Sequence, residues 1–461
     1  MPGTVPTAAG RLAARPAPAP APAPGGGTAT EPAPPLSRRA RRRRLLTLLG
    51  PAFVAAVAYV DPGNVAANIT AGARYGYTLT WVLVAANLMA MVVQYQSAKL
   101  GVVTGRSLPE VLRDRMGRRS RLAFLAQAEL VAVATDLAEV VGGAVALRLL
   151  LGLPLLAGGL VIGAVSIALL LLQEHRGQRL FEGVVVALLV VITVGFVGGL
   201  VVAPPDWGAV VGGLRPRLEG SGALLVAASM LGATVMPHAI YLHSSLVRDH
   251  DGATRASGSA AGAGRSPAAP GSAEAERTGK RLRGTRVDVV WALGLAGVVN
   301  IALLLLAASA LSGAAGTDTI EGAHTAISAS LGPAVGVIFA VGLLASGLAS
   351  TSVGAYAGAE ILSGLLRVRV PILVQRLITL LPALLVLAAG AEPTRALVVS
   401  QVVLSFGIPF ALVPLIRVTS SAQVMGPWRD GVVLRVVSRV VAALIIALNL
   451  ALLWLTLTGR G

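Results

Sequence analysis

The chain contains no cysteine among its 461 residues. This absence excludes disulfide bonds, thiolate metal sites and cysteine nucleophiles, and it removes one source of information on the redox compartment. Charged residues are also scarce, at 13%, and aromatic residues make up only 4%, whereas 55% of the residues are hydrophobic. A soluble globular domain carries about 25% charged residues. A chain with this balance needs lipid around it, so the composition predicts an integral membrane protein.

Histidine is scarce as well, with five residues, and none of them stands in a His-Glu-x-x-His pattern. An intramembrane metalloprotease would need that pattern or an equivalent on one helix. The formal net charge is +17, which would favour nucleic-acid binding if the basic residues formed a stripe on a soluble domain. They lie instead between apolar segments. The sequence therefore predicts neither an enzyme nor a nucleic-acid-binding protein.

The N-terminal region differs from the rest of the chain. Residues 1–36 are dominated by Ala, Pro and Gly, and six arginines follow between Arg38 and Arg44. Such a composition buries too little apolar surface to fold alone. Arginines before an apolar segment also match the start of a signal peptide, with Ala56-Val57-Ala58 as a cleavage-like site. The many later spans favour a retained first helix, so we expect residues 1–44 to form a disordered, basic cytoplasmic tail.

Long apolar runs occupy most of residues 45–461. A run of about 20 apolar residues is long enough to cross a bilayer as a helix. Eleven segments meet this condition, which predicts an all-α polytopic membrane protein. The approximate spans are 45–70, 77–103, 122–150, 154–172, 181–203, 222–247, 287–312, 333–365, 371–390, 394–417 and 431–458.

Basic residues are distributed unevenly between these spans. With the N-terminus in the cytoplasm, most of the 38 Lys and Arg residues lie on the inner side, and the outer segments hold Arg74, Arg148, Arg215, Arg217, Arg395 and Arg460. Cytoplasmic loops are enriched in Lys and Arg, so this distribution predicts a cytoplasmic N-terminus and an external C-terminus. Only two of the basic residues are lysine, a usage typical of high-GC bacteria, and we expect a bacterial inner membrane. Residues 248–286, rich in Gly, Ala and Ser, are expected to form a flexible cytoplasmic loop.

Two of the spans are interrupted by proline beside polar residues, at Asp61 to Asn64 in the first span and at Met236 to His238 in the sixth. Proline has no N–H, so the carbonyl four residues earlier loses its helical partner. The freed carbonyls would be those of Ala58 and Ala233. In lipid, such a carbonyl is tolerated only where it is buried in protein or lines a cavity. Each break is therefore predicted to present an oxygen ligand.

Side chains complete a candidate metal site at these breaks. Asp61 supplies a carboxylate, Asn64 an amide oxygen and Met236 a thioether, beside the carbonyls of Ala58 and Ala233. Oxygen ligands alone would suit Ca²⁺ or Mg²⁺, whereas a thioether favours softer ions such as Mn²⁺, Fe²⁺, Cd²⁺ or Co²⁺. Taken singly, Met236 could equally fill a gap in the core and the proline could be a simple kink. Two breaks in corresponding positions favour the metal site, with Met236 as its selectivity residue.

The first and sixth spans are five spans apart. This is the spacing expected of two inverted five-helix repeats whose broken first helices meet near the bilayer midplane. The repeats would cover residues 45–203 and 222–417, followed by an extra helix at 431–458. Residue identity between the two halves does not reveal the repeat.

These motifs resemble the Nramp family of proton-coupled divalent metal transporters, in particular its bacterial manganese transporters. The resemblance covers about residues 45–420 and is carried by Asp61 to Asn64, Thr135 to Glu139, Ala233 to Ser244 and Gln401 to Ser405. The chain departs from the usual family pattern at Ala239, Ala349 and Ala359.

The resemblance implies a leucine-transporter-like fold with 11 transmembrane helices. It also implies that Asp61, Asn64, Met236 and the Ala233 carbonyl bind the metal. In some conformations the Ala58 carbonyl and the Gln401 side chain would join them.

Three acidic residues in the third span, Glu129, Asp136 and Glu139, are separated by seven and three positions and so share one helical face. Acids inside a membrane are costly and usually functional. Arg376, near the start of the ninth span, is their expected counter-charge. The resemblance implies a proton path that leads from the metal site, directly or through His238, to these groups. A structural ion pair between the third and ninth spans is the alternative.

Other polar residues give weaker signals. We expect His243 to be a helix-end or loop residue, and Gln94 to hold neighbouring helices together.

The predicted function is secondary active import of divalent transition-metal ions, such as Mn²⁺ and Fe²⁺, coupled to protons by alternating access. Metal ions, protons and lipids would be the partners, with no cofactor and no obligatory protein partner. A Mg²⁺ carrier of a related family is one alternative, against which Met236 argues. A sodium-coupled amino-acid carrier of the same fold is another, although Asp61 would repel a carboxylate substrate. An ion channel is disfavoured by the paired broken helices.

Overall fold

The computed structural model describes residue 3 and residues 51–176, 178–256, 273–313, 316–317, 319–366 and 370–458. The chain divides into two units, Met1–Leu45 and Leu46–Gly461. The predicted tail, residues 1–44, lies outside the described residues apart from Gly3. The helices of the described residues all belong to the second unit.

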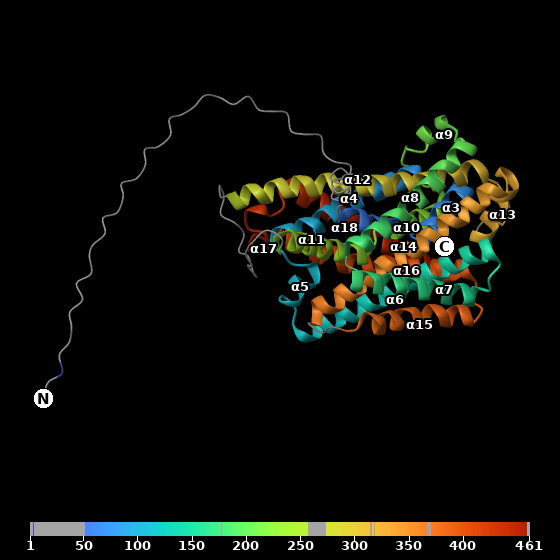
Figure 1. Ribbon diagram of the computed structural model, residues 1–461. Helices are drawn as coiled ribbons and strands as arrows, with labels where there is room; N and C mark the ends of the chain where they lie inside the picture. The colour runs from blue at the N-terminus through green and yellow to red at the C-terminus, as the bar shows by residue number, and fades with distance from the viewer. Residues whose placement is uncertain are drawn as a thin grey trace, which may run out of the picture. The chain divides into compact units, whose positions relative to one another are not determined.

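Every regular element among the described residues is a helix. In chain order they are α2 (Pro51–Val57), the 3₁₀ helix η1 (Ala58–Val60), α3 (Pro62–Tyr75), α4 (Thr80–Thr104), α5 (Leu108–Arg113), α6 (Arg118–Leu151), α7 (Leu155–Arg176), α8 (Gln178–Val202), α9 (Trp207–Gly212), α10 (Gly220–Thr234), α11 (Pro237–Ala256), α12 (Ala273–Ala310), α13 (Ile320–Leu331), α14 (Pro333–Leu366), α15 (Ile372–Ala388), α16 (Pro393–Thr419), α17 (Ala422–Met425), η2 (Gly426–Trp428) and α18 (Val432–Thr458) (Figure 1).

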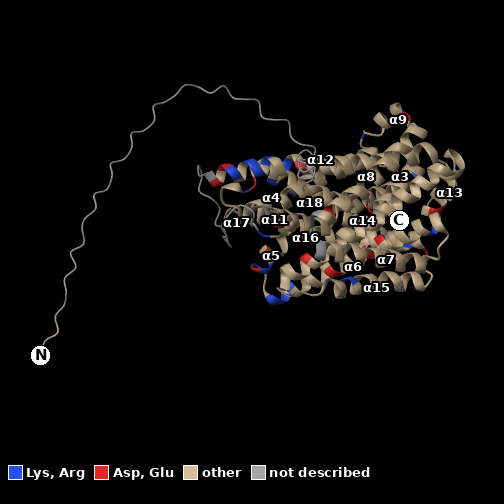
Figure 2. Cartoon of the chain, in the orientation of Figure 1, with Lys and Arg blue, Asp and Glu red and all other residues tan. Residues whose placement is uncertain are grey.

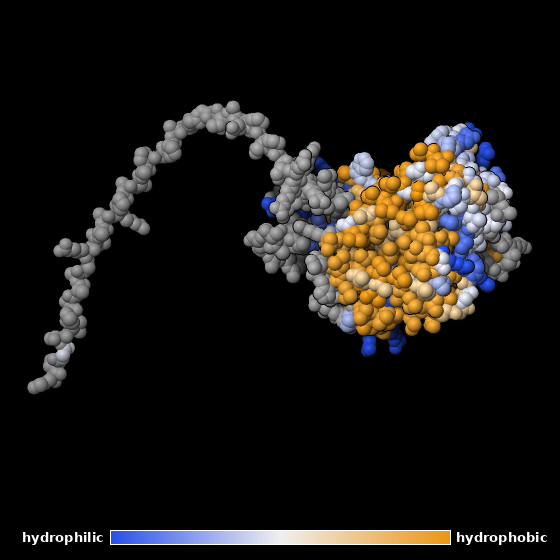
Figure 3. Space-filling view, turned by 45° about the vertical axis from the view of Figure 1, so that its right-hand side comes forward, coloured by the Kyte–Doolittle hydropathy of each residue, from blue (hydrophilic) through white to orange (hydrophobic). Residues whose placement is uncertain are grey.

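Within the described residues, nine helical segments are long and apolar enough to cross a membrane, and the apolar segments Pro51–Val60 and Leu373–Ala388 are shorter. The predicted all-α polytopic architecture is therefore confirmed, whereas the count of eleven spans stays a prediction. Charged residues gather towards the ends of the long helices, notably on the first half of α12 and around α5 (Figure 2). A broad hydrophobic surface covers the helices between these ends (Figure 3). Such a surface is stable only in lipid.

The interior is organised around α6, which packs against α14, α15 and α16, while α12 packs against α3 and α4. Small residues permit close approach where helices cross, as is common in membranes. Gly142 of α6 lies against the ring of Pro62 at the start of α3, and a Cβ added there would come within 2.2 Å of the Pro62 Cβ. The α6 helix therefore touches the first break directly.

The predicted loop at 248–286 is wrong at both ends, because α11 continues to Ala256 and α12 begins at Ala273. Glu274 and Glu276 lie in the first turn of α12, where negative charge favours the helix dipole. Glu276 also pairs with Lys280 one turn later, at 2.7 Å. A polar composition excluded a membrane span here, yet it did not exclude a helix. Residues 257–272 lie outside the described residues.

Candidate metal-binding site

The first break lies at Asp61. Helix η1 ends at Val60, Asp61 is extended (φ −80°, ψ 167°), and α3 begins at Pro62. Proline suits the first helical position because the N–H that it lacks would have no partner there. The Asp61 carboxylate accepts hydrogen bonds from the backbone N–H groups of Gly63, at 3.1 Å, and Asn64, at 3.0 Å. Asp61 is therefore a buried N-cap held at the positive end of α3.

The second break lies between α10 and α11. Helix α10 ends at Thr234, Val235 leaves the helical conformation (φ −98°, ψ 87°), and α11 begins at Pro237. Met236 lies in the break and is completely buried. Both helix interruptions predicted from the prolines are thus present.

The two breaks meet through Asn64. Its side-chain Nδ2 donates hydrogen bonds to Asp61 Oδ1, at 2.6 Å, and to the carbonyl oxygen of Ala233, at 2.8 Å. The hydroxyl of Thr234 lies 3.4 Å from Asn64 Oδ1. A carboxylate, an amide and a freed backbone carbonyl are therefore brought together from segments 169 residues apart in the chain. Turning the amide about its last bond would present its oxygen to the same point.

Gln401, on α16, lies against the first break. A Cβ added to Gly63 would come within 1.7 Å of Gln401 Nε2 and 2.9 Å of Asp61 Oδ2, so glycine is required for this close approach. Gln401 is buried, and neither polar atom of its amide has a hydrogen-bond partner among the described residues. Leaving buried polar groups unsatisfied costs about 1–3 kcal/mol each. The structure therefore places an unsatisfied amide beside Asp61, which fits a ligand role.

Ala58 lies in η1 and is fully buried just before the break. The next two carbonyls are held by neighbouring helices: Asn300 Nδ2 donates to Tyr59 O at 2.7 Å, and Ser346 Oγ donates to Val60 O at 2.5 Å. Sequence reasoning missed both donors. They fix the irregular backbone that a helix interruption leaves inside the membrane.

Asp136 and Arg376 form the predicted ion pair. Asp136 Oδ2 lies 2.5 Å from Arg376 Nη1, and both side chains are buried between α6 and α15. Arg376 Nε also donates to Ser166 Oγ of α7, at 2.7 Å. The charge of this carboxylate is thus balanced inside the protein.

The other two acids of α6 have different surroundings. Glu139 is fully buried and accepts a hydrogen bond from Ser350 Oγ of α14, at 2.5 Å. Glu129 is half-buried, about three turns before Glu139 on the continuous helix. Arg376 therefore pairs directly with Asp136 rather than with all three acids, and Ser350 is the partner that sequence reasoning missed.

His238 connects the second break with α6. It is buried in the first turn of α11, and its Nδ1 lies 3.4 Å from the hydroxyl of Thr135, the residue before Asp136. His238 Nε2 has no hydrogen-bond partner in the described part of the chain. The imidazole thus lies between the second break and the α6 segment that carries Asp136.

The prediction for His243 is wrong. This residue is buried inside α11, and its Nδ1 lies 2.8 Å from Gln94 Oε1 of α4. Gln94 Nε2 in turn donates to the hydroxyl of Tyr59 at 2.6 Å. The interhelical role expected of Gln94 is confirmed, and it reaches the first broken helix.

Residues 52–455 match the family model described as natural resistance-associated macrophage protein-like, or Nramp. The chain belongs to the Nramp family. A divalent metal cation transporter of Mycobacterium tuberculosis is 56% identical over 412 residues, which cover 89% of this chain and 92% of that protein. Membership in Nramp, a family of membrane transporters, confirms that the chain is not an enzyme.

Solved structures agree with this assignment. A crystal structure of the Eremococcus coleocola manganese transporter has a TM-score of 0.77 at 29% identity and covers 90% of this chain and 87% of that one. A nucleobase-cation-symport-1 family transporter in a closed conformation has a TM-score of 0.56 at 16% identity, with 88% and 89% covered. The second likeness shows the fold alone. Together they confirm the predicted leucine-transporter-like fold of this Nramp chain.

Proposed function

We propose that this protein imports divalent transition-metal ions, Mn²⁺ and Fe²⁺ among them, across a bacterial inner membrane. The contact of Asp61, Asn64 and the Ala233 carbonyl across the two helix breaks carries the proposal. The M. tuberculosis relative is named a divalent metal cation transporter and the E. coleocola protein a manganese transporter, which supports the same cargo.

The proposed ligand set suits a cargo that must leave again. Among the described residues no group of three or more His, Cys, Asp or Glu side chains could hold a metal. The proposed site instead combines one carboxylate, Asp61, with an amide, backbone carbonyls and the thioether of Met236. Because only one ligand is charged, the ion would be bound reversibly rather than as a permanent cofactor.

Met236 supports a transition metal over Mg²⁺ or Ca²⁺, because a thioether is a soft ligand and this residue is buried in the second break. Asp61 disfavours the sodium-coupled amino-acid alternative. A buried carboxylate at the helix break would repel the carboxylate of an amino acid.

Proton coupling is part of the proposal. His238, beside the second break, lies next to Thr135, and Asp136 follows on the same helix with Arg376 as its partner. Glu139 lies one turn further along α6. We infer that protons move along this face of α6 while the metal moves between the broken helices, so the two ions use different groups.

The same two helix breaks support alternating access. Helix α3 begins and helix α10 ends at the proposed site; Asp61 separates α3 from the first half of its span, and Val235 and Met236 separate α10 from α11. Hinges at helix ends absorb large backbone changes at low cost. With a cytoplasmic N-terminus and an external C-terminus, as the basic residues favour, α3 and α10 would be the outer halves.

Purified protein in liposomes that contain a pH-sensitive dye tests this function directly. An inward Mn²⁺ gradient should drive Mn²⁺ uptake together with acidification of the lumen, and Fe²⁺ and Cd²⁺ should compete while Mg²⁺ and Ca²⁺ do not. Uptake without acidification would reject proton coupling but keep metal transport. Equal competition by Mg²⁺ would reject the transition-metal assignment.

A further inference from the structure

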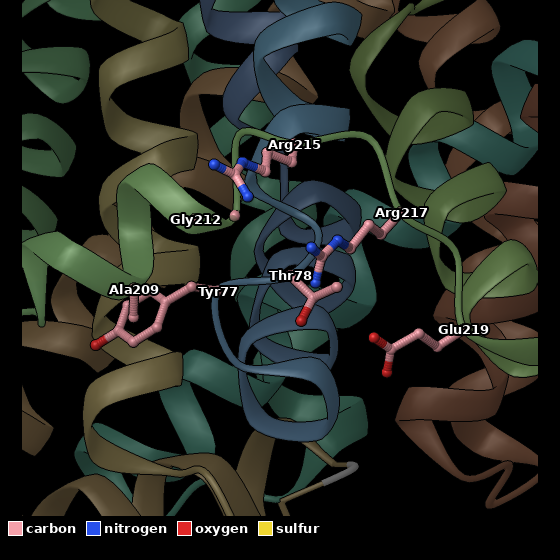
Figure 4. Close-up of a pocket in the computed structure, with 8 residues that line it drawn as sticks. Tyr77, Thr78, Ala209, Gly212, Arg215, Arg217 and Glu219 are labelled. Carbon is pink, nitrogen blue, oxygen red and sulfur yellow. The ribbon is translucent and has the colours of Figure 1, made fainter.

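A cavity of about 420 Å³ lies away from the metal site, between the α3–α4 connection and the α9–α10 connection. Its charged and polar lining is provided by Tyr77, Thr78, Arg215, Arg217 and Glu219 (Figure 4). Ligand pockets commonly enclose about 300–1,000 Å³. The cavity is therefore large enough for a small ligand or a lipid headgroup.

The two connections are fastened to each other, so the cavity has fixed walls. Trp81 N donates to Gly213 O at 3.0 Å, and Trp81 Nε1 donates to Arg217 O at 3.2 Å. The backbone N–H of Asp206 donates to the Tyr77 hydroxyl at 3.2 Å. Close packing adds to this, since a Cβ on Gly213 would come within 2.0 Å of Tyr77 O. Positioning the lining in advance lowers the entropic cost of binding.

The three charged side chains of the cavity have no charged partner in the part of the chain that the structure describes. Arg215, Arg217 and Glu219 are exposed, and none of the three side chains has an ion-pair or hydrogen-bond partner among the described residues. In the view of Figure 4 the Arg217 guanidinium lies just above Thr78, the Arg215 guanidinium lies above Gly212, and the Glu219 carboxylate extends towards Thr78 from the other side. Basic residues are rare on the side of the membrane that we propose faces outward. Two of them nevertheless share one cavity in a protein whose proposed cargo is a cation.

We propose that this cavity binds a phosphate group that carries an ammonium substituent, as in phosphoethanolamine. Guanidinium groups bind phosphate oxygens through paired, charge-assisted hydrogen bonds, so Arg215 and Arg217 would hold the phosphate. The hydroxyl of Thr78 is a further donor, and Glu219 would accept the ammonium group. The ligand can come from a phospholipid headgroup or from a soluble phosphoethanolamine compound.

The cavity lies where a bound ligand would affect metal transport. Helix α3 ends at Tyr75, two residues before Tyr77, and α10 begins at Gly220, directly after Glu219. A ligand that spans the cavity therefore joins the outer ends of the two half-helices that carry the metal site. If the proposed transport function holds, the ligand should slow the separation of these ends and lower the rate of Mn²⁺ uptake.

Binding is measured independently of transport. The full-length protein is purified and offered phosphatidylethanolamine or phosphatidylglycerol, and retained lipid is counted by native mass spectrometry. We expect phosphatidylethanolamine to be retained preferentially, and R215A/R217A to weaken its binding about tenfold or more. Arg395→Ala is the matched control, because it removes an outer positive charge at the start of α16 and should leave binding unchanged.

Two further measurements test the role of Glu219 and identify the source of the ligand. Glu219→Gln should keep phosphate binding and lose the preference for ethanolamine over glycerol. Soluble glycerophosphoethanolamine that displaces the lipid identifies a headgroup site open to both sources, while binding of the lipid alone identifies the membrane as the source. Single variants Arg215→Gln and Arg217→Gln cover the case in which the double variant does not fold.

The proposal is overturned if the arginine variants retain phosphatidylethanolamine as well as the unmodified protein does, or if Arg395→Ala lowers retention equally. A protein that binds the lipid but fails to take up Mn²⁺ would contradict the transport function and leave this site intact. The two failures are therefore distinguishable.

Discussion

The protein contains two buried acidic clusters, one around Asp61 and one around Asp136, and their carboxylates have different partners. The Asp61 carboxylate is held by backbone N–H groups and by the amide of Asn64. The Asp136 carboxylate instead faces the guanidinium of Arg376 at 2.5 Å. Both acids are almost completely buried, so burial alone does not distinguish them.

The difference lies in the remaining charge. Hydrogen-bond donors and a helix N-terminus stabilise the Asp61 carboxylate but supply no full positive charge, so the site still attracts a cation. Arg376 already neutralises Asp136, and a metal ion there would have to displace a buried arginine. This difference is the basis for proposing that Asp61 binds the metal cargo and that Asp136 belongs to the proton path. Substitutions in and around the two clusters test this division, from the largest expected effect to the smallest.

Asp61→Ala should reduce Mn²⁺ uptake in proteoliposomes to background, because it removes the one charged ligand of the proposed site and the cap of α3. Uptake of radioactive Mn²⁺ over the first minute is the measurement. Asp114→Ala, which removes a carboxylate outside the membrane-spanning helices, is the control and should transport normally. Unchanged uptake in Asp61→Ala would show that the metal binds elsewhere.

Asp136→Asn should abolish or uncouple proton movement while Mn²⁺ binding changes by less than about threefold. The substitution keeps the shape of the side chain and removes the negative charge that pairs with Arg376. Calorimetry reports Mn²⁺ affinity, and the internal pH dye reports proton flux. Loss of Mn²⁺ binding together with loss of proton flux would show that Asp61 and Asp136 act as one site.

Gly63→Ala should weaken Mn²⁺ affinity by about tenfold, the effect of about 1.4 kcal/mol. The new methyl group would occupy the space of the Gln401 amide and press on Asp61 Oδ2. Adding Gln401→Ala to this variant should recover part of the affinity, because removal of the Gln401 amide makes room for the new methyl group. Gly198→Ala, where the added methyl group meets no atom within 4 Å, is the control. Normal affinity in Gly63→Ala would remove Gln401 from the site.

Met236→Ala should retain most Mn²⁺ transport while allowing Ca²⁺ to compete. The thioether contributes little to affinity for hard ions, so its loss mainly removes discrimination. Competition curves of Ca²⁺ against Mn²⁺ uptake, with Met230→Ala of α10 as a buried methionine control, provide the measurement. If Ca²⁺ stays excluded, selectivity resides in the geometry of the oxygen ligands.

The sequence alone determined where the helices break and which acids lie in the membrane. Pro62 and Pro237 act on their own backbone, so the interruptions at Asp61 and Met236 follow from local chemistry. The shared face of Asp136 and Glu139 follows from helical periodicity. These features need no knowledge of neighbouring helices.

Only the tertiary structure decided which groups satisfy one another. Ser350 donates to Glu139 from 211 positions away, and Ser166 accepts from Arg376 across 210. A single serine on an apolar helix carries no local pattern that names its partner. The close approach of Gln401 to Gly63 and the position of Arg215 and Arg217 in the lining of one cavity depend in the same way on how the helices and connections pack. Local chemistry set the breaks in the chain, and packing between distant segments built the sites around them.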